Sequence, residues 1–503
     1  MVLKMLAQII KNTNRFLEQI PRSERKKKGQ FFTSIEIARF MAKMFDLTRI
    51  PEKVNILDPG TGTGILSAAV LERLEKETKI KAIHLTCYET DTKVLPVLKQ
   101  NMEYIAAVLH KNFSYEIRKE DYILSQQNDF NKISFANPDS KKYDLIIGNP
   151  PYLRIRKANA TAQAMPSVVH GSPNLYFLFT TMSLFNLRED AEMVYIIPRS
   201  WTSGAYFSAF RRYLLDNGKI NHIHLFVSRD KVFPEEQVLQ ETMIIKIRKT
   251  SKAPDCILIT SSQGNADFNH ITYLDVPYNS VIKGTMLYVY LPVCKGDMQV
   301  LDAINTYKNT LPEEGLRMRT GIVVDFRQKE DLKKEPGEYD LPLFYSQHIK
   351  GGRVNHNPSG KEFDWITSKK KNLIQKNQNY VFCKRFTAKE ERRRLQCGIY
   401  NPNDFKQYKF IATQNKINYI DRIDGLEMSL DTTYGVFALF NSTLFDMYYR
   451  ILNGSTQVNS TEINSIPVPP IKLINKMGNQ LRESKDLSTD NCDRIVMEMA
   501  YCL

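Results

Sequence analysis

The feature that most constrains the fold is a regular alternation of short apolar runs and helical patterns between residues 54 and 249. It begins with the run VNILD, a glycine-rich turn and the helical pattern ILSAAVLERLEKE, and the run AIHLTCYE follows at 82–89. Strands that alternate with helices of this length indicate right-handed βαβ crossovers and a mostly parallel sheet. We therefore predict an α/β fold with a Rossmann-like sheet that carries helices on both faces.

Later apolar runs extend the same series along the chain. They predict strands at 143–149, 193–198, 220–227 and 241–249. The last of these strands is expected to close the sheet. The alternation becomes irregular between residues 250 and 320, which places a domain boundary near residue 300.

A chain of 503 residues favours more than one domain, because one hydrophobic core seldom organises so many residues. Residues 1–28 are expected to form an N-terminal helix and a basic arm, and residues 29–300 the α/β domain. Residues 301–503 place short strand-like and helical segments between turns rich in Asn, Gly and Pro. That pattern predicts a second domain of mixed α+β structure.

The chain lacks the marks of a membrane or secreted protein. No uninterrupted apolar run approaches the roughly 18 residues of a membrane span, and the opening MVLKMLAQIIKN has a lysine inside a short apolar stretch. The seven cysteines are scattered and form no C-x-x-C pair that would suggest zinc or a redox couple. We therefore expect a soluble, cytoplasmic protein with reduced thiols, no metal centre and no membrane partner.

The excess positive charge is local. Of the formal net charge of +15, residues 341–420 hold +11 and residues 1–28 hold +6, so the rest of the chain is slightly acidic. The densest basic runs within residues 341–420 are Lys369-Lys370-Lys371, Lys384-Arg385 and Arg392-Arg393-Arg394. The aromatic residues Trp365, Tyr380, Phe382 and Phe386 lie among these runs. Basic residues mixed with aromatic ones suit phosphate contacts and base stacking, and a solvated face that binds nothing is the alternative.

Three glycines, Gly60, Gly62 and Gly64, lie in the turn after the first predicted strand. Glycine lets the backbone turn tightly there and lets a ligand approach main-chain N–H groups at the start of the next helix. The second strand ends in Glu89, 31 residues after Asp58, where a carboxylate could accept hydrogen bonds from two ribose hydroxyls. These residues predict a site for an adenosine-type ligand, such as S-adenosylmethionine or a dinucleotide. A solvated charge at a strand end is the alternative for Glu89.

The tetrapeptide Asn149-Pro150-Pro151-Tyr152 follows directly on the apolar strand LIIG. The two prolines fix the backbone and donate no hydrogen bond, so the Asn149 side chain and the Pro150 carbonyl can face one small target as paired acceptors. Paired acceptors suit a planar amine, and the Tyr152 ring offers a face for stacking. The motif therefore predicts a site at which an aromatic or amide –NH2 group acts as nucleophile. In isolation, a polyproline-like strand exit is the alternative.

The order of these motifs resembles that of gamma-class, TaqI-like N6-adenine DNA methyltransferases. The matching segments are GQFFTSIEIARFM (29–41), DPGTGTG (58–64), YETD (88–91), EDY (120–122), NPPY (149–152), NLYFLF (174–179), IIPRSW (196–201) and VFP (232–234). The length, the QFFT opening and LNGSTQVNSTEINSIPVP (452–469) are most similar to the BsuBI/PstI-type modification enzymes. The resemblance implies an S-adenosylmethionine-dependent methyltransferase followed by a target-recognition domain.

The resemblance also implies roles for individual residues. Asn149 and Pro150 would accept from the N6 amine of an adenine flipped out of duplex DNA, and Tyr152 and Phe233 would contact the two faces of that base. The residues that would hold S-adenosylmethionine are Thr33, Asp58, Gly60, Gly62 and Gly64 for the methionine part, Glu89 for the ribose, Asp121 for the adenine amino group, and Tyr122 and Phe179 for the adenine ring. Asp58 stands where relatives often have Glu.

Partners follow from the same resemblance. The protein would act as a monomer on double-stranded DNA in a prokaryotic cell and protect it from a separate restriction endonuclease, with CTGCAG as the implied sequence. Candidate DNA contacts are Lys369, Lys370, Lys371, Lys384, Arg385, Arg392, Arg393, Arg394, Gln457 and Asn459. For the last two, a capped turn that includes Glu462 is an equal alternative.

Other functions stay open at this point. The N-P-P-Y element also occurs in enzymes that methylate a protein glutamine and in some RNA methyltransferases. Residues 452–469 also resemble target-recognition domains, so a non-catalytic DNA-specificity subunit is a further alternative.

Overall fold

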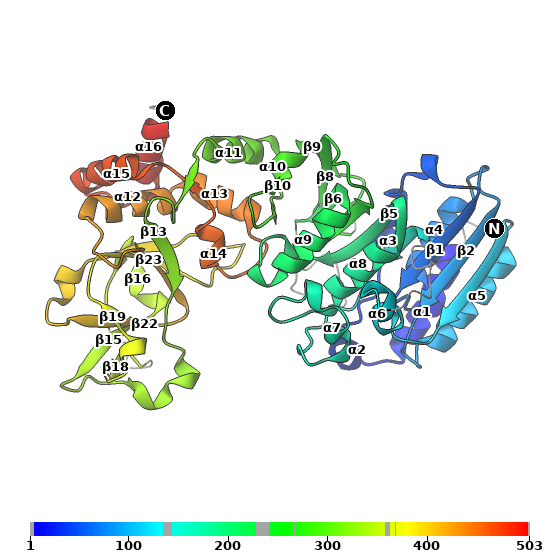
Figure 1. Ribbon diagram of the computed structural model, residues 1–503, viewed down its shortest axis with the longest axis horizontal. Helices are drawn as coiled ribbons and strands as arrows, with labels where there is room; N and C mark the ends of the chain where they lie inside the picture. The colour runs from blue at the N-terminus through cyan, green and yellow to red at the C-terminus, as the bar shows by residue number, and fades with distance from the viewer. Residues whose placement is uncertain are drawn as a thin grey trace. The chain divides into compact units, whose positions relative to one another are not determined.

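The computed structural model describes residues 5–133, 143–227, 241–265, 267–357, 363–367 and 369–500. Contacts within the chain divide it into two compact units, Met1–Val293 and Cys294–Leu503 (Figure 1). None of the described helices is long and apolar enough to cross a membrane.

A mixed sheet forms the centre of the first unit. Its strands are β1 (Lys53–Pro59), β2 (Ala82–Tyr88), β3 (Asn112–Arg118), β4 (Tyr143–Gly148), β5 (Leu187–Pro198), β6 (Lys219–Phe226), β7 (Thr242–Arg248), β8 (Cys256–Ser262) and β9 (Thr272–Pro277). They lie in the order β3-β2-β1-β4-β5-β7-β6-β8-β9. β7 and β9 are antiparallel to their neighbours, whereas the other adjacent pairs are parallel. β4 is buried at every position, as expected for a central strand that is covered on both faces.

Helices connect these strands and cover the sheet. They are α1 (Met5–Glu18), α2 (Arg22–Lys28), α3 (Ile35–Lys43), α4 (Ile65–Leu74), α5 (Leu95–Val108), α6 (Tyr122–Phe130), α7 (Ala160–Gln163), α8 (Leu175–Asn186), α9 (Ser208–Asn217) and α10 (Tyr278–Val281), and α10 leads into the hairpin β10 (Ile282–Lys283) and β11 (Tyr288–Val289). α1, α3, α4 and α5 pack in one group, and α6, α8 and α9 pack in another. Right-handed crossovers that run outward from β1 and from β4 place the two groups on opposite faces. The predicted α/β class is confirmed.

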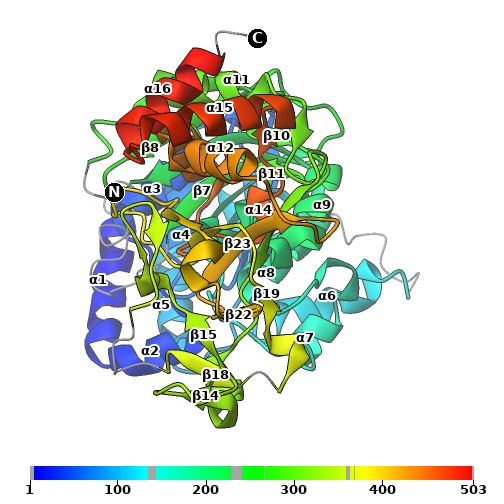
Figure 2. The ribbon, with the colours of Figure 1, turned by 90° about the vertical axis from the view of Figure 1, so that its left-hand side faces the viewer.

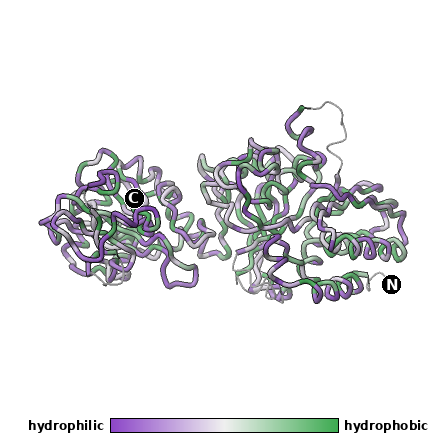
Figure 3. The backbone as a smooth tube through the Cα atoms, turned by 90° about the horizontal axis from the view of Figure 1, so that it is seen from below, coloured by the Kyte–Doolittle hydropathy of each residue, from purple (hydrophilic) through white to green (hydrophobic). Residues whose placement is uncertain are grey.

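The N-terminal helix α1 packs on the sheet domain and belongs to the same compact unit. Its apolar residues recur at helical spacing, and hydrophobic and hydrophilic positions alternate along it in Figure 3. The side chains of Leu6, Ile9 and Phe16 are buried, because this stripe faces α4 and α5.

The observed strands differ from expectation at both ends of the sheet. β7 does not close the sheet: it is inserted between β5 and β6, and β8 and β9 continue the sheet beyond β6. β3 was not predicted, because its sequence NFSYEIR is only half buried at the edge of the sheet and lacks an apolar run. Strand order depends on pairings between distant segments, which local periodicity does not encode.

The described residues of the second unit form two larger sheets and one two-stranded sheet. One consists of β13 (Leu316–Thr320), β23 (Ile417–Arg422), β20 (Tyr380–Lys384), β21 (Cys397–Tyr400), β17 (Arg353–Val354) and β16 (Ile349–Lys350), in that order. The other consists of β14 (Leu332–Lys333), β18 (Trp365–Thr367), β15 (Asp340–Phe344), β22 (Phe410–Thr413) and β19 (Gln375–Lys376), again in that order, and β12 (Asn309–Thr310) pairs separately with β24 (Pro467–Val468). The mixed α+β character predicted for this part of the chain is confirmed.

Helices complete the second unit. They are α11 (Lys295–Asn305), α12 (Leu430–Asn441), α13 (Thr443–Leu452), α14 (Ser460–Ile463), α15 (Ile471–Ser484) and α16 (Thr489–Ala500). α12, α15 and α16 pack side by side (Figure 2). Glycine permits the contact between α12 and α15: a β-carbon on Gly435 would meet the Ile474 carbonyl, and one on Gly478 would meet the Asp431 carbonyl.

Candidate functional site

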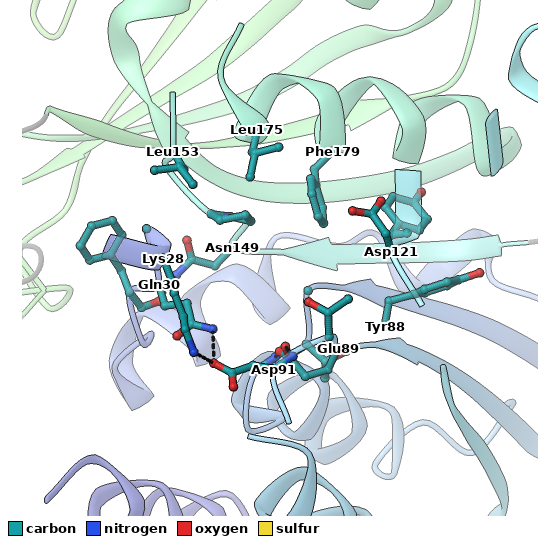
Figure 4. Close-up of a pocket in the computed structure, with 18 of the residues that line it drawn as sticks. Lys28, Gln30, Tyr88, Glu89, Asp91, Asp121, Asn149, Leu153, Leu175 and Phe179 are labelled. Carbon is teal, nitrogen blue, oxygen red and sulfur yellow. Dashed lines mark hydrogen bonds and ion pairs between the residues drawn. The ribbon is translucent and has the colours of Figure 1, made fainter. Parts of the chain in front are cut away.

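A pocket of about 630 Å³ opens where β1, β2, β3 and β4 end. The turn after β1, the residues after β2, β3 and β4, and one side of α8 line it (Figure 4). The segment 27–33, between α2 and α3, supplies the remaining wall. Ligands of open α/β sheets bind at this position, outside the carboxyl ends of the strands where the strand order reverses.

The glycine turn after β1 has the geometry that its sequence predicts. Gly60, Gly62 and Gly64 all have positive φ angles, of 78°, 58° and 89°, which side-chain-bearing residues rarely adopt. At Gly64 a β-carbon would also lie 2.6 Å from the Met102 side chain. The N–H groups of Gly60 and Thr61 donate to the Tyr88 carbonyl, each over 2.9 Å, so the turn is fastened to the end of β2.

The helix α1 braces this turn from behind. The hydroxyl of Thr13 lies 2.8 Å from that of Thr63, and Asn12 donates to Asn101 over 2.7 Å. Asn101 in turn donates to the Thr63 carbonyl over 2.8 Å. Three buried polar side chains therefore fix the backbone of the turn. In the sequence, polar residues within an apolar helical pattern are the only sign of this arrangement.

Glu89 lies at the end of β2 and faces the turn. Its carboxylate accepts from the Gly62 N–H over 2.9 Å and from the Asp91 N–H over 2.8 Å. Burial raises the pKa of Glu89, although these backbone hydrogen bonds oppose the shift. The carboxylate is thus already oriented at the pocket wall before any ligand binds.

Asp58 is buried beneath the turn and is not part of the pocket lining. One carboxylate oxygen accepts from the Ser67 hydroxyl over 2.6 Å, and the other, Oδ1, has no hydrogen-bond partner among the described residues. Burial raises the pKa of Asp58 to about 7, with a smaller contribution from the charge of Glu89. Asp58 therefore acts on the pocket through the turn that it underlies.

Three aromatic rings form another part of the pocket lining. The ring centroid of Tyr122 is 5.0 Å from that of Tyr88 and 5.6 Å from that of Phe179. Asp121 caps α6, since its Oδ1 accepts from the N–H groups of Ile123 and Leu124 over 2.9 Å each. The structure thus brings seven of the nine candidate cofactor-binding residues to one pocket, and they are Thr33, Gly60, Gly62, Glu89, Asp121, Tyr122 and Phe179.

Asn149 follows β4 and lines the same pocket (Figure 4). Its Nδ2 donates to the Phe31 carbonyl over 2.8 Å and to the Thr33 hydroxyl over 3.0 Å. Its Oδ1 is buried and has no hydrogen-bond partner among the described residues. An unsatisfied buried acceptor costs about 1–3 kcal/mol, so an oxygen left in this state beside a pocket marks a place for a donor from a ligand.

The rest of the tetrapeptide is placed differently. Pro151 lines the pocket, whereas Pro150 and Tyr152 do not. Tyr152 is only 9% exposed: its hydroxyl donates to the Ile196 carbonyl over 2.9 Å, and its ring lies 5.4 Å from that of Phe31. Phe233, the predicted second contact to the target base, lies outside the described residues.

A salt bridge holds the segment before α3 against the pocket. Lys28 and Gln30 both donate to one oxygen of Asp91, over 2.7 Å and 3.1 Å (Figure 4). Gly29, between them, has a φ of 66° and its carbonyl accepts from the Tyr152 N–H over 3.2 Å. Sequence reasoning missed these three contacts to the pocket wall, although Asp91 stands only two positions after Glu89.

The predicted DNA contacts fall into two groups in the second unit. Arg394 is 1% exposed, and its guanidinium donates to Thr387, Asn453 and the Ser455 carbonyl within the unit. Arg393 donates to the carbonyls of Phe440 and Ser442. The expectation that all three arginines of this run face DNA is therefore corrected. Arg392 is exposed, whereas Arg393 and Arg394 donate to groups of the protein itself.

The other basic and aromatic positions divide in the same way. Lys369, Lys370 and Lys371 are exposed, with Lys370 paired to Asp331 over 2.6 Å, and Lys384 and Arg385 are partly exposed. Tyr380 and Phe382 belong to the hydrophobic core, so their expected role in base stacking is wrong, whereas Phe386 is exposed. A charge-rich pattern cannot tell these environments apart, because burial at each position depends on partners from other parts of the chain.

The turn that holds Gln457 and Asn459 is tightly bonded. Asn459 lies at the N-cap of α14, but its side chain donates to Glu462 over 2.9 Å and makes no cap bond to a helix N–H. Gln457 Oε1 accepts from Arg385 over 3.5 Å. Elsewhere, no group of three or more His, Cys, Asp or Glu residues that could hold a metal ion is found in the part of the chain that is described.

Comparison with known proteins places this architecture among modification enzymes. The family model described as Eco57I restriction-modification methylase matches residues 69–233. The chain is 31% identical over 463 residues to the type II methyltransferase M.BsuBI of Bacillus subtilis, an alignment that covers 91% of this chain and 90% of the relative. It is also 31% identical over 468 residues to the type II methyltransferase M.PstI of Providencia stuartii, with the same coverage.

The fold is also found in a solved structure, that of the type IIL restriction-modification enzyme MmeI in complex with DNA. The two share 13% sequence identity and align with a TM-score of 0.52 over 98% of this chain and 75% of MmeI. At this identity the similarity concerns the fold alone.

Proposed function

The chain belongs to the type II methyltransferases of restriction-modification systems, the family of M.BsuBI and M.PstI, and on this premise we propose that it methylates N6 of an adenine within a specific DNA sequence. The cofactor of this family is S-adenosylmethionine, which supplies an electrophilic methyl group on a sulfonium when it is bound. The observation that carries the adenine proposal is the Asn149 side chain beside the pocket, whose Oδ1 has no hydrogen-bond partner in the part of the chain that the structure describes.

The Asn149 amide is oriented for an amine. Because Phe31 and Thr33 both take hydrogen bonds from its Nδ2, its Oδ1 is the atom left for a ligand donor. The lone pair of an aromatic amine is delocalised into the ring, which makes the nitrogen a poor nucleophile. Acceptance of its hydrogens by Asn149 Oδ1 and the Pro150 carbonyl would localise that lone pair and hold the nitrogen in place.

The pocket is suited to an adenosine-type cofactor. We assign the ribose to Glu89, whose carboxylate is held at the wall by the Gly62 and Asp91 N–H groups. The adenine ring is assigned to Tyr122 and Phe179, with its amino group at Asp121, whose Oδ1 caps α6. Thr33 and the glycine turn would hold the methionine part, with Asp58 supporting the turn from below.

The target adenine must leave the duplex to reach this site, because its amino group is inaccessible within stacked base pairs. Tyr152 is the proposed partner for one face of the flipped base, with its ring fixed by the hydrogen bond to Ile196. Phe233 remains the proposed partner for the other face.

The open alternatives are less well supported. The similarity to M.BsuBI extends over 91% of the chain and therefore includes the second unit. An enzyme that methylates a protein glutamine would not require this unit. A DNA-specificity subunit without catalysis would not need a glycine turn, a ribose carboxylate and an unpaired amide oxygen in one pocket. We further propose that the protein acts as a monomer in the cytoplasm of a prokaryote, beside a separate endonuclease, and that CTGCAG is its target.

Long-read sequencing of DNA from cells that express the protein tests the proposal, since it reports both the modified base and its sequence context. We expect N6-methyladenine at one short sequence, and none in cells that express Asn149→Ala. The variant should still bind S-adenosylmethionine, and Asn112→Ala, which changes an exposed asparagine on β3, should methylate as the wild type does. Methylated cytosine in place of adenine, or unchanged methylation by Asn149→Ala, would contradict the proposal.

A further inference from the structure

Two loops of the second unit form a short antiparallel ribbon that presents one aromatic side chain to solvent. The Thr387 N–H donates to the Thr456 carbonyl over 3.1 Å, and the Val458 N–H donates to the Arg385 carbonyl over 2.7 Å. Phe386 pairs with Gln457 between these bonds. We call residues 385–387 and 456–458 the loop ribbon. Phe386 is 46% exposed on it, whereas Phe382, four positions earlier on β20, lies in the core of its sheet.

Buried polar groups hold the loop ribbon from below. Arg394 donates to the Thr387 hydroxyl over 3.1 Å and to the Ser455 carbonyl over 2.7 Å, so it ties both loops together. Asn453 donates to the Gln457 carbonyl over 3.1 Å and to the fully buried Glu462 over 2.5 Å. Buried polar side chains therefore hold both strands of the loop ribbon, and with them the backbone of Phe386, in place.

Positive charge surrounds the exposed ring. Lys384 and Arg385 precede it, and the Arg385 guanidinium lies 5.6 Å from the centroid of the Phe386 ring. The main-chain N–H of Arg385 donates to the carbonyl of Lys416, whose side chain is exposed. Glu391 is also exposed on the neighbouring loop, but its carboxylate accepts from the Ala388 N–H and from Gln396, each over 2.6 Å.

We propose that the loop ribbon enters the bound DNA duplex and that Phe386 inserts between neighbouring bases, with Lys384, Arg385 and Lys416 facing the phosphates. The inference rests on the proposed function, because it takes duplex DNA as the substrate. Phe386 is then the side chain that disturbs base stacking when the target adenine is exposed. Apolar side chains that enter between base steps unstack them, and cations beside such a wedge contact the backbone.

The structure favours insertion over a passive surface contact. The ring is attached to backbone that is bonded on both sides, so little conformational entropy is lost when it stacks on a base. Stacking of a base on an aromatic side chain contributes about 1–3 kcal/mol, which corresponds to a roughly five- to 150-fold change in affinity.

Two variants of Phe386 in the full-length protein test this directly. Phe386→Ala should lower the affinity for a short duplex that contains the methylated sequence by about five- to 150-fold. Its melting temperature and its binding of S-adenosylmethionine should stay at the wild-type values, because the ring is exposed and lies in the other unit. Phe386→Leu, which keeps an apolar wedge, should recover part of the affinity.

Phe386→Trp gives a spectroscopic readout of stacking. We expect its added fluorescence to be quenched when the duplex is bound. The matched control is Tyr339→Trp, since Tyr339 is 70% exposed in the same unit and stands between Glu338 and Asp340. Its fluorescence should not change.

The outcomes separate the two proposals. If the wild type methylates DNA and Phe386→Ala binds the duplex as tightly, or the indole introduced by Phe386→Trp is not quenched, the wedge is refuted and the proposed function stands. If the wild type methylates no DNA at all, the proposed function fails and the wedge falls with it.

Discussion

The Nδ2 of Asn149 donates a hydrogen bond to the hydroxyl of Thr33 over 3.0 Å, although the two residues are 116 positions apart in the sequence. Together with the bond to the Phe31 carbonyl, this contact engages the Nδ2 end of the amide, while the Oδ1 end has no partner among the residues that are described. The segment before α3 thus sets the direction of an acceptor that belongs to the end of β4.

Thr33→Val should therefore impair methyl transfer without a change at Asn149 itself. Valine has a similar shape but cannot accept the hydrogen bond, and one lost bond of this kind is worth about 0.5–1.5 kcal/mol, or a roughly two- to tenfold lower kcat/KM. Thr33→Ser retains the hydroxyl and should keep nearly wild-type turnover. Transfer of labelled methyl groups to duplex DNA measures both variants, and equal rates for valine and serine would contradict the role of the hydroxyl.

Asp58 should make the stability of the protein depend on pH. Burial raises its pKa from the ordinary value of 3.8 to about 7, so between these values the folded protein binds a proton that the unfolded chain has released. The free energy of unfolding should then fall as the pH rises through this window and level off above it. Asp58→Asn cannot titrate, and its stability relative to the wild type should increase over the same window. Urea unfolding at several pH values measures this difference, and a constant difference would be the contrary result.

Replacement of Arg392 by alanine should affect DNA binding, whereas the same replacement at Arg394 should affect folding stability. Arg394→Ala removes a buried guanidinium and leaves its acceptors on Thr387, Asn453 and Ser455 without this donor, and an unsatisfied buried polar group costs about 1–3 kcal/mol of folding free energy. Arg392→Ala leaves an exposed position and should keep the melting temperature. We expect it to weaken DNA binding most at low salt, which a titration of affinity against salt concentration would reveal.

Gly478→Ala should destabilise the second unit, because the added methyl group would meet the Asp431 carbonyl of the neighbouring helix. Overpacking of this kind costs about 1–3 kcal/mol or more. Gly296→Ala is the matched control: it also lies in a helix, and its β-carbon would be at an ordinary 3.6 Å from Cys294. It should leave the stability unchanged or raise it by up to about 1 kcal/mol. Thermal unfolding of both variants provides the comparison.

The sequence predicted those parts of the site that depend on local geometry. The glycine turn, Glu89 and Asn149 each follow a strand, and the carboxyl ends of neighbouring strands meet at one edge of a sheet, so their grouping in one pocket follows from the order of elements. The salt bridge of Lys28 with Asp91 and the support from Thr13 join segments that are distant in sequence, and no periodicity signals such contacts.

The basic region of the second unit was harder to interpret from sequence. Three identical residues follow one another at positions 392–394, yet only Arg392 is exposed. Tyr380 and Phe382 lie two positions apart on β20 and bury their rings in the core, whereas Phe386 follows the end of that strand and reaches solvent. Burial of a charged residue is decided by partners such as Asn453, which are supplied from another part of the chain.

The residues that support the loop ribbon differ from those exposed on it and beside it, which has a consequence for how DNA recognition can change over evolution. Arg394, Asn453 and Glu462 maintain the backbone and contribute no exposed surface that could read DNA. Phe386, Thr456 and Arg392 are exposed, and their replacement leaves that support intact. Enzymes with new sequence preferences should therefore arise more readily by substitution at the second set than at the first, and a library randomised at those three exposed positions should yield many folded proteins from which altered specificity can be selected.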